Sequence, residues 1–118
     1  MILVDTSVWV DHLNRTESEL VKLLNSAMVC THPFIIGELS CGNISKRSEI
    51  LNLLNSLPRI EPAFEEEVYT LLDDKKLYGI GLGFVDIHLL ASALINHVII
   101  WTTDKVLKKT AQNLNIYI

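Results

Sequence analysis

The chain opens with an apolar run that ends on an acid, "MILVDTSVW". The first four residues predict a buried strand, yet Asp5 follows them directly, and two hydroxyl residues come before the next apolar residue. A carboxylate at the edge of a core is costly unless hydrogen bonds or a cation compensate its charge. This junction therefore constrains the fold, because a buried strand has to end where its acid can be compensated.

Strand and helix patterns alternate along the rest of the chain. Short apolar runs predict strands at 1–5, 27–31 and 98–102 and a terminal strand at 116–118. Apolar residues at helical spacing predict several helices, of which the first has Thr6 or Ser7 as its N-cap. The others are predicted around 20–27, 33–41 (ended by Gly42), 50–57, 64–72 (closed near Gly79), 84–96 and 105–114. This alternation predicts an α/β fold, a three-layer sandwich in which helices flank a central, mostly parallel sheet.

Size and composition narrow the class of protein. With 118 residues, of which 49% are hydrophobic, the chain is expected to form one domain over 1–118, and disorder is excluded. No apolar stretch approaches the roughly 20 residues of a membrane helix, and no secretory signal is recognisable, so we expect a cytoplasmic protein without a membrane segment. Cys30 and Cys41 are predicted to be small buried thiols in a reducing compartment.

Four of the fourteen acidic residues stand where the pattern predicts apolar surroundings. Asp5 and Asp104 follow predicted strands, and the carboxyl ends of parallel strands meet at one edge, where open α/β sheets bind ligands. Glu38 and Asp86 lie on apolar faces of predicted helices and could complete a cluster there. Hard oxygen ligands without a cysteine or histidine set predict Mg²⁺ or Mn²⁺ rather than zinc.

Each acid also has a simpler explanation. Asp5 could cap the following helix, Asp86 could serve the first turn of its own helix, and Asp104 could be a turn residue. The remaining acids, such as those of 65–67, are interpreted as solvated helix faces. We favour the shared cation site, because it accounts for all four misplaced acids together.

The same acids carry a family resemblance. Four segments, "MILVDTSVWVDHL", "HPFIIGELSCG", "GIGLGFVDIHLLASAL" and "WTTDKVLKKTAQNL", occur in order over essentially the whole chain. Together they resemble the PIN-domain ribonucleases, specifically the VapC-type toxins of bacterial and archaeal toxin–antitoxin pairs. The resemblance implies a PIN-like sandwich. It also implies four catalytic acids: Asp5, Glu38, Asp86 and Asp104. All of these except Glu38 are the implied main metal ligands. The implied supporting hydroxyl residues beside the metal are Thr6, Ser7 and Thr103. In the commonest relatives an Arg stands where this chain has Thr103.

The resemblance also implies an activity and partners. These are hydrolysis of RNA phosphodiesters with Mg²⁺ or Mn²⁺, with transfer or ribosomal RNA as substrate, inhibition by a VapB-type antitoxin, and a homodimer or toxin–antitoxin hetero-oligomer. A net charge of −4 argues mildly against nucleic-acid binding unless the carboxylates hold cations. Basic residues that could form a weak RNA-binding rim, or merely solubilise the chain, are Lys46, Arg47, Lys105, Lys108 and Lys109.

Aromatic and histidine residues are less informative. Trp9 and Trp101 could stack on bases, but their apolar neighbours favour the core. Alternatively, Trp9 and Leu13 could be more than the core can bury. They would then line a groove for the antitoxin, together with the helix that contains 20–24. The four histidines show no metal-ligand spacing, so structural or surface roles are expected for His12, His32, His88 and His97.

Other functions remain open at this stage. The chain could be a PIN-like interaction module without activity. It could also be a phosphotransferase that uses Asp5 as nucleophile, although Ser7 stands where such enzymes often place a second Asp. A signalling receiver domain should carry its phosphorylated Asp on a middle strand, and neither of the predicted strands in the middle of the chain, 27–31 and 98–102, carries one.

Overall fold

A computed structural model describes residues 1–118 and contains one parallel sheet. Its strands are β1 (Ile2–Val4), β2 (Val29–Cys30) and β3 (Ile99–Trp101), in the order β2-β1-β3. Leu3 of the central strand pairs with Cys30 on one side and Ile100 on the other. Because all three strands run in the same direction, the residues that follow them lie at one edge of the sheet.

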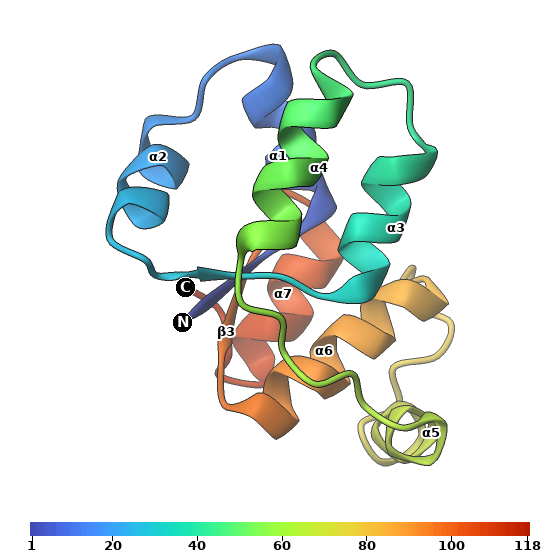
Figure 1. Ribbon diagram of the computed structural model, residues 1–118. Helices are drawn as coiled ribbons and strands as arrows, with labels where there is room; N and C mark the ends of the chain where they lie inside the picture. Colours follow the sequence, from blue (N-terminus) through green and yellow to red (C-terminus); the bar gives the residue numbers. More distant parts are fainter.

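Seven helices surround this sheet, with the strands in the middle of the molecule (Figure 1). They are α1 (Thr6–Asn14), α2 (Ser18–Asn25), α3 (Pro33–Cys41), α4 (Arg47–Ser56), α5 (Glu65–Asp74), α6 (Phe84–Asn96) and α7 (Lys105–Asn113). The predicted α/β class with a parallel sheet flanked by helices is confirmed. The longest helix, α6, has 13 residues, and none combines the length and apolar character that crossing a bilayer requires.

The core is built from the strands and the helices packed on them. Leu3, Val4 and Ile100 are fully buried, and α6 is buried over most of 87–93, as expected of a helix that is apolar on nearly all sides. Trp9 is also completely buried, with its ring edge-on to His12. The favoured core position of Trp9 is confirmed, and the alternative in which Trp9 exceeds the core and lines a groove is wrong, because its whole indole is buried.

Several predicted ends differ from the structure because the backbone turns earlier. Helix α2 stops at Asn25, since Ala27 adopts a left-handed conformation with φ of 55°. Helix α5 stops at Asp74 rather than near Gly79, and Lys76 is likewise left-handed. The terminal "IYI" forms no strand and contributes only a bridge between Tyr117 and Ile100.

The two cysteines differ in exposure. Cys30 lies in β2 and is buried, and burial raises the pKa of its thiol. Cys41 is the last residue of α3 and is exposed, so the prediction of two buried thiols is wrong for Cys41. Both thiols are free.

Candidate active site

Two strand ends place acids at the carboxyl edge of the sheet. Asp5 follows β1, and its backbone N–H donates to the Trp101 carbonyl (2.9 Å), which continues the pairing with β3. Asp104 comes three residues after Trp101 and is the N-cap of α7, where its Oδ1 accepts from the Leu107 N–H (2.9 Å). The predicted N-cap of α1, Thr6 or Ser7, is corrected to Asp5, whose carboxylate makes no cap hydrogen bond.

Hydroxyl groups hold the Asp5 carboxylate instead. Ser7 Oγ and Thr102 Oγ1 each donate to Asp5 Oδ2 at 2.8 Å. Ser7 Oγ accepts from the Thr103 N–H (3.0 Å), and Thr102 Oγ1 accepts from the Asp104 N–H (3.1 Å). Each hydroxyl therefore donates its only hydrogen to Asp5. Together the two hydroxyls connect the loop between β3 and α7 to the start of α1.

Thr102 is the site residue that sequence reasoning missed. Thr103 was the predicted supporting hydroxyl, but its side chain is exposed and it contributes through its backbone N–H. Ile100 and Thr102 are buried, whereas Trp101 and Thr103 are not, which is the period-two pattern of an extended segment. Continuing that alternation two residues beyond Ile100 would have pointed to Thr102.

Glu38 is held by Thr6, another of the predicted supporting hydroxyl residues. It lies on α3, and its Oε1 accepts from Thr6 Oγ1 at 2.8 Å. Thr6 is the first residue of α1, so this bond ties Glu38 to the residue next to Asp5.

Asp86 is the third residue of α6 and accepts from the Gly83 N–H through Oδ2 (2.9 Å). Burial raises the pKa of Asp86, and the hydrogen bond from Gly83 lowers it. The negative charges of Asp5, Asp104 and Glu38 raise this pKa further. The fold thus brings carboxylates from four separate segments into one electrostatic neighbourhood, although they are far apart in the sequence.

The burial of these acids differs from the prediction. Only Asp5 is buried, at 7% exposure; Asp86 is half-buried, and Glu38 and Asp104 are exposed. The prediction of four acids on buried faces is therefore wrong for two of them. Glu38 on α3 and Asp104 at the start of α7 are both exposed to solvent. The simpler roles also hold in part, because Asp86 and Asp104 both cap their own helices.

The donor set suits a hard cation. In each of the three aspartates one carboxylate oxygen accepts hydrogen bonds, and the other makes none. No three acidic, histidine or cysteine side chains are close enough together to hold a metal ion by themselves. Mg²⁺ usually keeps several waters and binds through only one or two carboxylates, so the oxygens that make no hydrogen bond are the ligand type it prefers.

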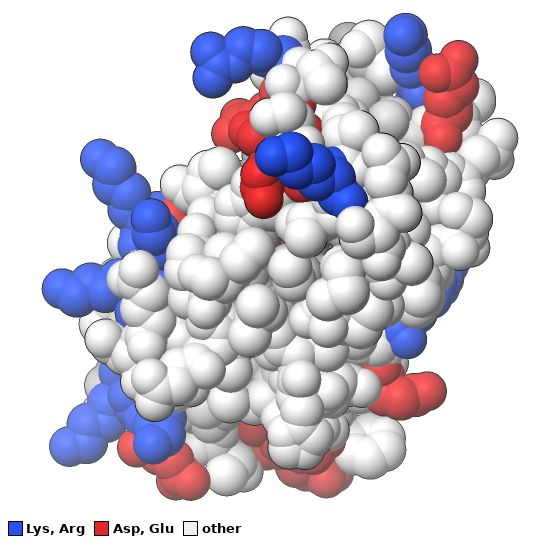
Figure 2. Space-filling view, turned by 90° about the vertical axis from the view of Figure 1, so that its left-hand side faces the viewer, with Lys and Arg blue, Asp and Glu red and all other residues white.

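The predicted basic residues fall into two groups, one at the start of α4 and one on α7. Arg47 donates through Nε and Nη2 to the Ser40 carbonyl (3.2 and 3.0 Å), and Lys46 is the left-handed N-cap of α4. Lys108 lies over the Tyr117 ring at 5.3 Å. Lys105 and Lys109 are exposed on α7 and line a shallow cavity. Figure 2 shows one face of the molecule, where Lys and Arg stand along the border of a broad uncharged centre.

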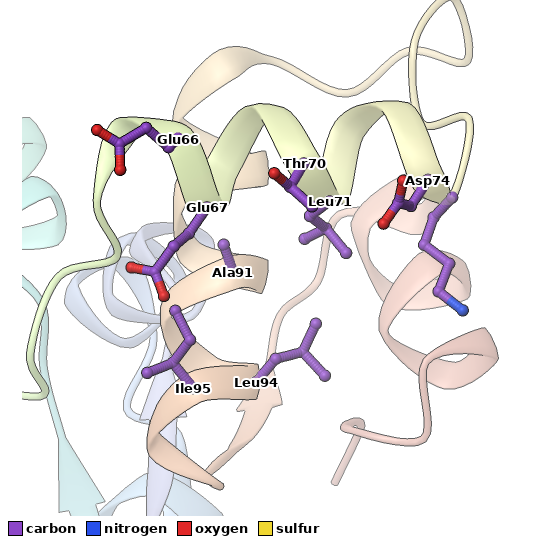
Figure 3. Close-up of a pocket in the computed structure, with 9 residues that line it drawn as sticks. Glu66, Glu67, Thr70, Leu71, Asp74, Ala91, Leu94 and Ile95 are labelled. Carbon is purple, nitrogen blue, oxygen red and sulfur yellow. The ribbon is translucent and has the colours of Figure 1, made fainter.

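A groove between α5 and α6 lies outside this constellation. Its volume is about 380 Å³, with an apolar floor and acidic residues along α5 (Figure 3). None of the four predicted site acids lines it.

Comparison with known proteins supplies an independent result. The family model described as "PIN domain" matches residues 2–113. Two proteins of Mycobacterium tuberculosis named Ribonuclease VapC32, from strains CDC 1551 / Oshkosh and ATCC 25618 / H37Rv, are each 44% identical to the chain over 109 residues. The aligned region covers 92% of this chain and 88% of each relative.

Proposed function

The chain belongs to the PIN-domain family, and from this premise we propose that it is a VapC-type, metal-dependent endoribonuclease toxin. The observation that carries the proposal is the electrostatic neighbourhood shared by Asp86 with Asp5, Asp104 and Glu38. Like charges gathered at one edge of the sheet are unfavourable on their own, and a divalent cation relieves their repulsion.

Each acid has a proposed role. Asp5, Asp86 and Asp104 hold Mg²⁺ or Mn²⁺, directly or through water, and Glu38 ligates or orients the attacking water. A metal ion held by these residues would supply an acidified water and charge stabilisation at the scissile phosphate. Ser7 and Thr102 keep Asp5 in one orientation through their hydrogen bonds, and Thr6 does the same for Glu38. The expected products carry a 5′-phosphate and a 3′-hydroxyl.

The proposal also covers the substrate and the partners of the protein. The RNA is a transfer or ribosomal RNA, approached through the basic residues Lys46, Arg47, Lys105, Lys108 and Lys109. The protein acts in the cytoplasm, which the two free thiols support. A VapB-type antitoxin inhibits it, within a homodimer or a toxin–antitoxin hetero-oligomer.

Cleavage of total cellular RNA tests the proposal. The purified protein is incubated with Mg²⁺, with EDTA, and as Asp5→Asn or Asp86→Asn. These substitutions keep an oxygen acceptor but remove a charge. We expect discrete fragments from the wild type with Mg²⁺ only, and no fragments above the EDTA background from either variant.

The other outcomes identify the alternatives. Wild-type turnover by both purified variants would disprove the assignment of the acids. A protein that is free of antitoxin by mass and leaves RNA intact would be an interaction module, and uptake of label from a phosphodonor would indicate phosphotransfer at Asp5.

A further inference from the structure

A second groove lies beside the acid site, between α3 and the start of α6. Its volume is about 630 Å³, within the range of roughly 300–1,000 Å³ of small-ligand pockets. Its lining includes Phe34, Gly37, Glu38, Cys41, Phe84 and Val85. Glu38 therefore faces both this groove and the acid site, and Phe84 and Val85 immediately precede Asp86 in the sequence.

Two exposed aromatic rings give the groove its character. Phe34 is 38% exposed and Phe84 is 49% exposed. The His88 ring contacts both edge-on, with 4.7 Å between ring centroids in each pair. His88 Nδ1 is buried and makes no hydrogen bond, so the contacts given for this ring are those with the two phenyl rings. The two phenyl rings are thus held in place while part of each remains open to solvent.

Gly37 keeps the groove open. It lies in the middle of α3, where glycine is less favourable than alanine. A Cβ atom built on Gly37 would meet nothing within 4 Å, so no neighbour in the chain requires the glycine. Because Gly37 lines the groove, a large side chain at this position would instead occupy groove space.

We propose that this groove takes an unpaired nucleobase of the RNA, next to the scissile phosphate, stacked on Phe34 and Phe84. The inference rests on the proposed ribonuclease function and names a contact of that substrate. Aromatic side chains stack on bases of any sequence, and single-stranded RNA exposes bases that can be splayed out.

The negative charge in the groove favours a nucleobase over a phosphate of the RNA backbone. Glu38 is the only charged residue that lines the groove, so a phosphate is repelled from it, whereas a neutral base is not. Arg47 is bonded to the carbonyl of Ser40, next to Cys41 at the end of the groove. A phosphate of the same strand can meet its charge there, outside the groove. Trp9 cannot take this role because it is fully buried.

Binding of a fluorescein-labelled, mixed-sequence single-stranded 12-mer RNA tests the proposal by anisotropy. The measurement uses the Asp5→Asn background with Mg²⁺, so that the probe stays intact. Phe34→Leu and Phe84→Leu keep apolar bulk but lose the stacking face, and each should weaken binding about fivefold or more. Gly37→Leu should weaken binding as strongly by filling the groove, without lowering the melting temperature. Phe64→Leu is the matched control, because Phe64 is 73% exposed and does not line the groove.

Each result has a distinct meaning. Unchanged affinity in folded Gly37→Leu and Phe84→Leu proteins, with a wild type that cleaves RNA, would overturn the stacking groove and leave the ribonuclease proposal intact. A wild type that neither cleaves RNA nor binds the probe would overturn both. If light scattering shows that Gly37→Leu dissociates a dimer and Phe64→Leu does not, the groove is an interface between copies, and the base-stacking assignment is wrong.

Discussion

At the scale of single residues, the site depends on hydroxyl groups as much as on carboxylates. Asp5 Oδ2 accepts two hydroxyl hydrogen bonds, and the donors accept backbone N–H groups from the following loop. Under the proposed role of Asp5 as a metal ligand, such partners fix its orientation, and their loss typically costs about 10–100-fold in metal affinity or activity. Thr102 is the strongest case because it is buried and joins Asp5 to the Asp104 backbone.

Thr102→Val is therefore expected to lower RNA cleavage about 10–100-fold and to raise the Mg²⁺ concentration needed for half-maximal rate. Valine preserves the shape of threonine but leaves Asp5 without one of its two donors. Thr102→Ser keeps the hydroxyl and should retain most of the activity. Equal rates and equal Mg²⁺ dependence for the Val and Ser variants would show that the hydroxyl does not position Asp5.

Asp86 gives a second prediction at this scale. Burial and three neighbouring acids raise its pKa, so its charge is unfavourable in the metal-free fold. Asp86→Asn removes that charge and keeps an acceptor for the Gly83 N–H, so its melting temperature in EDTA should equal or exceed that of the wild type. Mg²⁺ should raise the wild-type melting temperature more than that of the variant. A variant clearly less stable in EDTA would contradict the repulsion.

At the scale of elements, the site is assembled from helix beginnings. Asp5 and Asp104 are the N-caps of α1 and α7, and Asp86 lies in the first turn of α6. Helix N-termini favour negative charge, which helps three carboxylates to coexist before any cation binds. Helix α3 differs, because Glu38 stands in its second half and is held by a side chain of α1.

The glycine in α3 offers a test at this scale. Gly37→Ala should raise the free energy of unfolding by about 0.5–1 kcal/mol, because alanine is the better helix former and its Cβ meets nothing within 4 Å. Urea unfolding of both proteins measures the difference. A destabilised Gly37→Ala protein would mean that a neighbour does need the glycine.

At the scale of the whole molecule, one buried histidine joins separate parts of the chain. His32 Nδ1 accepts from the Phe34 N–H (3.0 Å), and its Nε2 lies 3.2 Å from Ser92 Oγ on α6. The same Ser92 oxygen accepts from the Ala63 N–H (2.9 Å), ahead of α5. Burial, with a smaller contribution from His88, lowers the pKa of His32 to about 4. His32 is therefore neutral in the folded protein, as its acceptor role requires.

This predicts loss of stability in mild acid. Between the ordinary histidine pKa and about 4, the unfolded chain binds a proton that folded His32 does not, so stability falls as pH falls through this window. From pH 7.5 to pH 5 the loss from His32 is about 2 kcal/mol. Urea unfolding at the two pH values measures the loss. His32→Asn, whose side-chain oxygen can take the place of Nδ1 and which does not titrate, should show a correspondingly smaller loss, and an equal loss would exclude His32 as its source.

Much of this architecture could be predicted from the sequence, because apolar runs and helical spacing are local signals. The α/β class and the parallel sheet followed from them, and so did Pro33 and Gly42 as the limits of α3. The left-handed turns at Ala27 and Lys76 were not predictable, since neither residue type favours that conformation.

The acids of the candidate site could be named from the sequence, but their exposure to solvent could not be predicted from it. Asp5, Glu38, Asp86 and Asp104 could be named from their positions in the pattern, and their catalytic roles remain predictions. Their exposure depends on how far each helix turns its residues toward solvent, which is a tertiary property. Thr102 was missed because the family resemblance pointed to the neighbouring Thr103. The period-two alternation marks Thr102 as inward-facing, but only the pairing of β3 with β1 brings it to Asp5.

The sheet order has a consequence for biosynthesis. The central strand β1 is synthesised before both of its neighbours, and it stays incomplete until β3 pairs with it. The hydrogen bond between Thr102 and Asp5 joins residues 97 positions apart, so a nascent chain cannot assemble the acid edge before the segment that follows β3 has left the ribosome. The acid edge therefore remains unassembled while the helices between β1 and β3 are being synthesised.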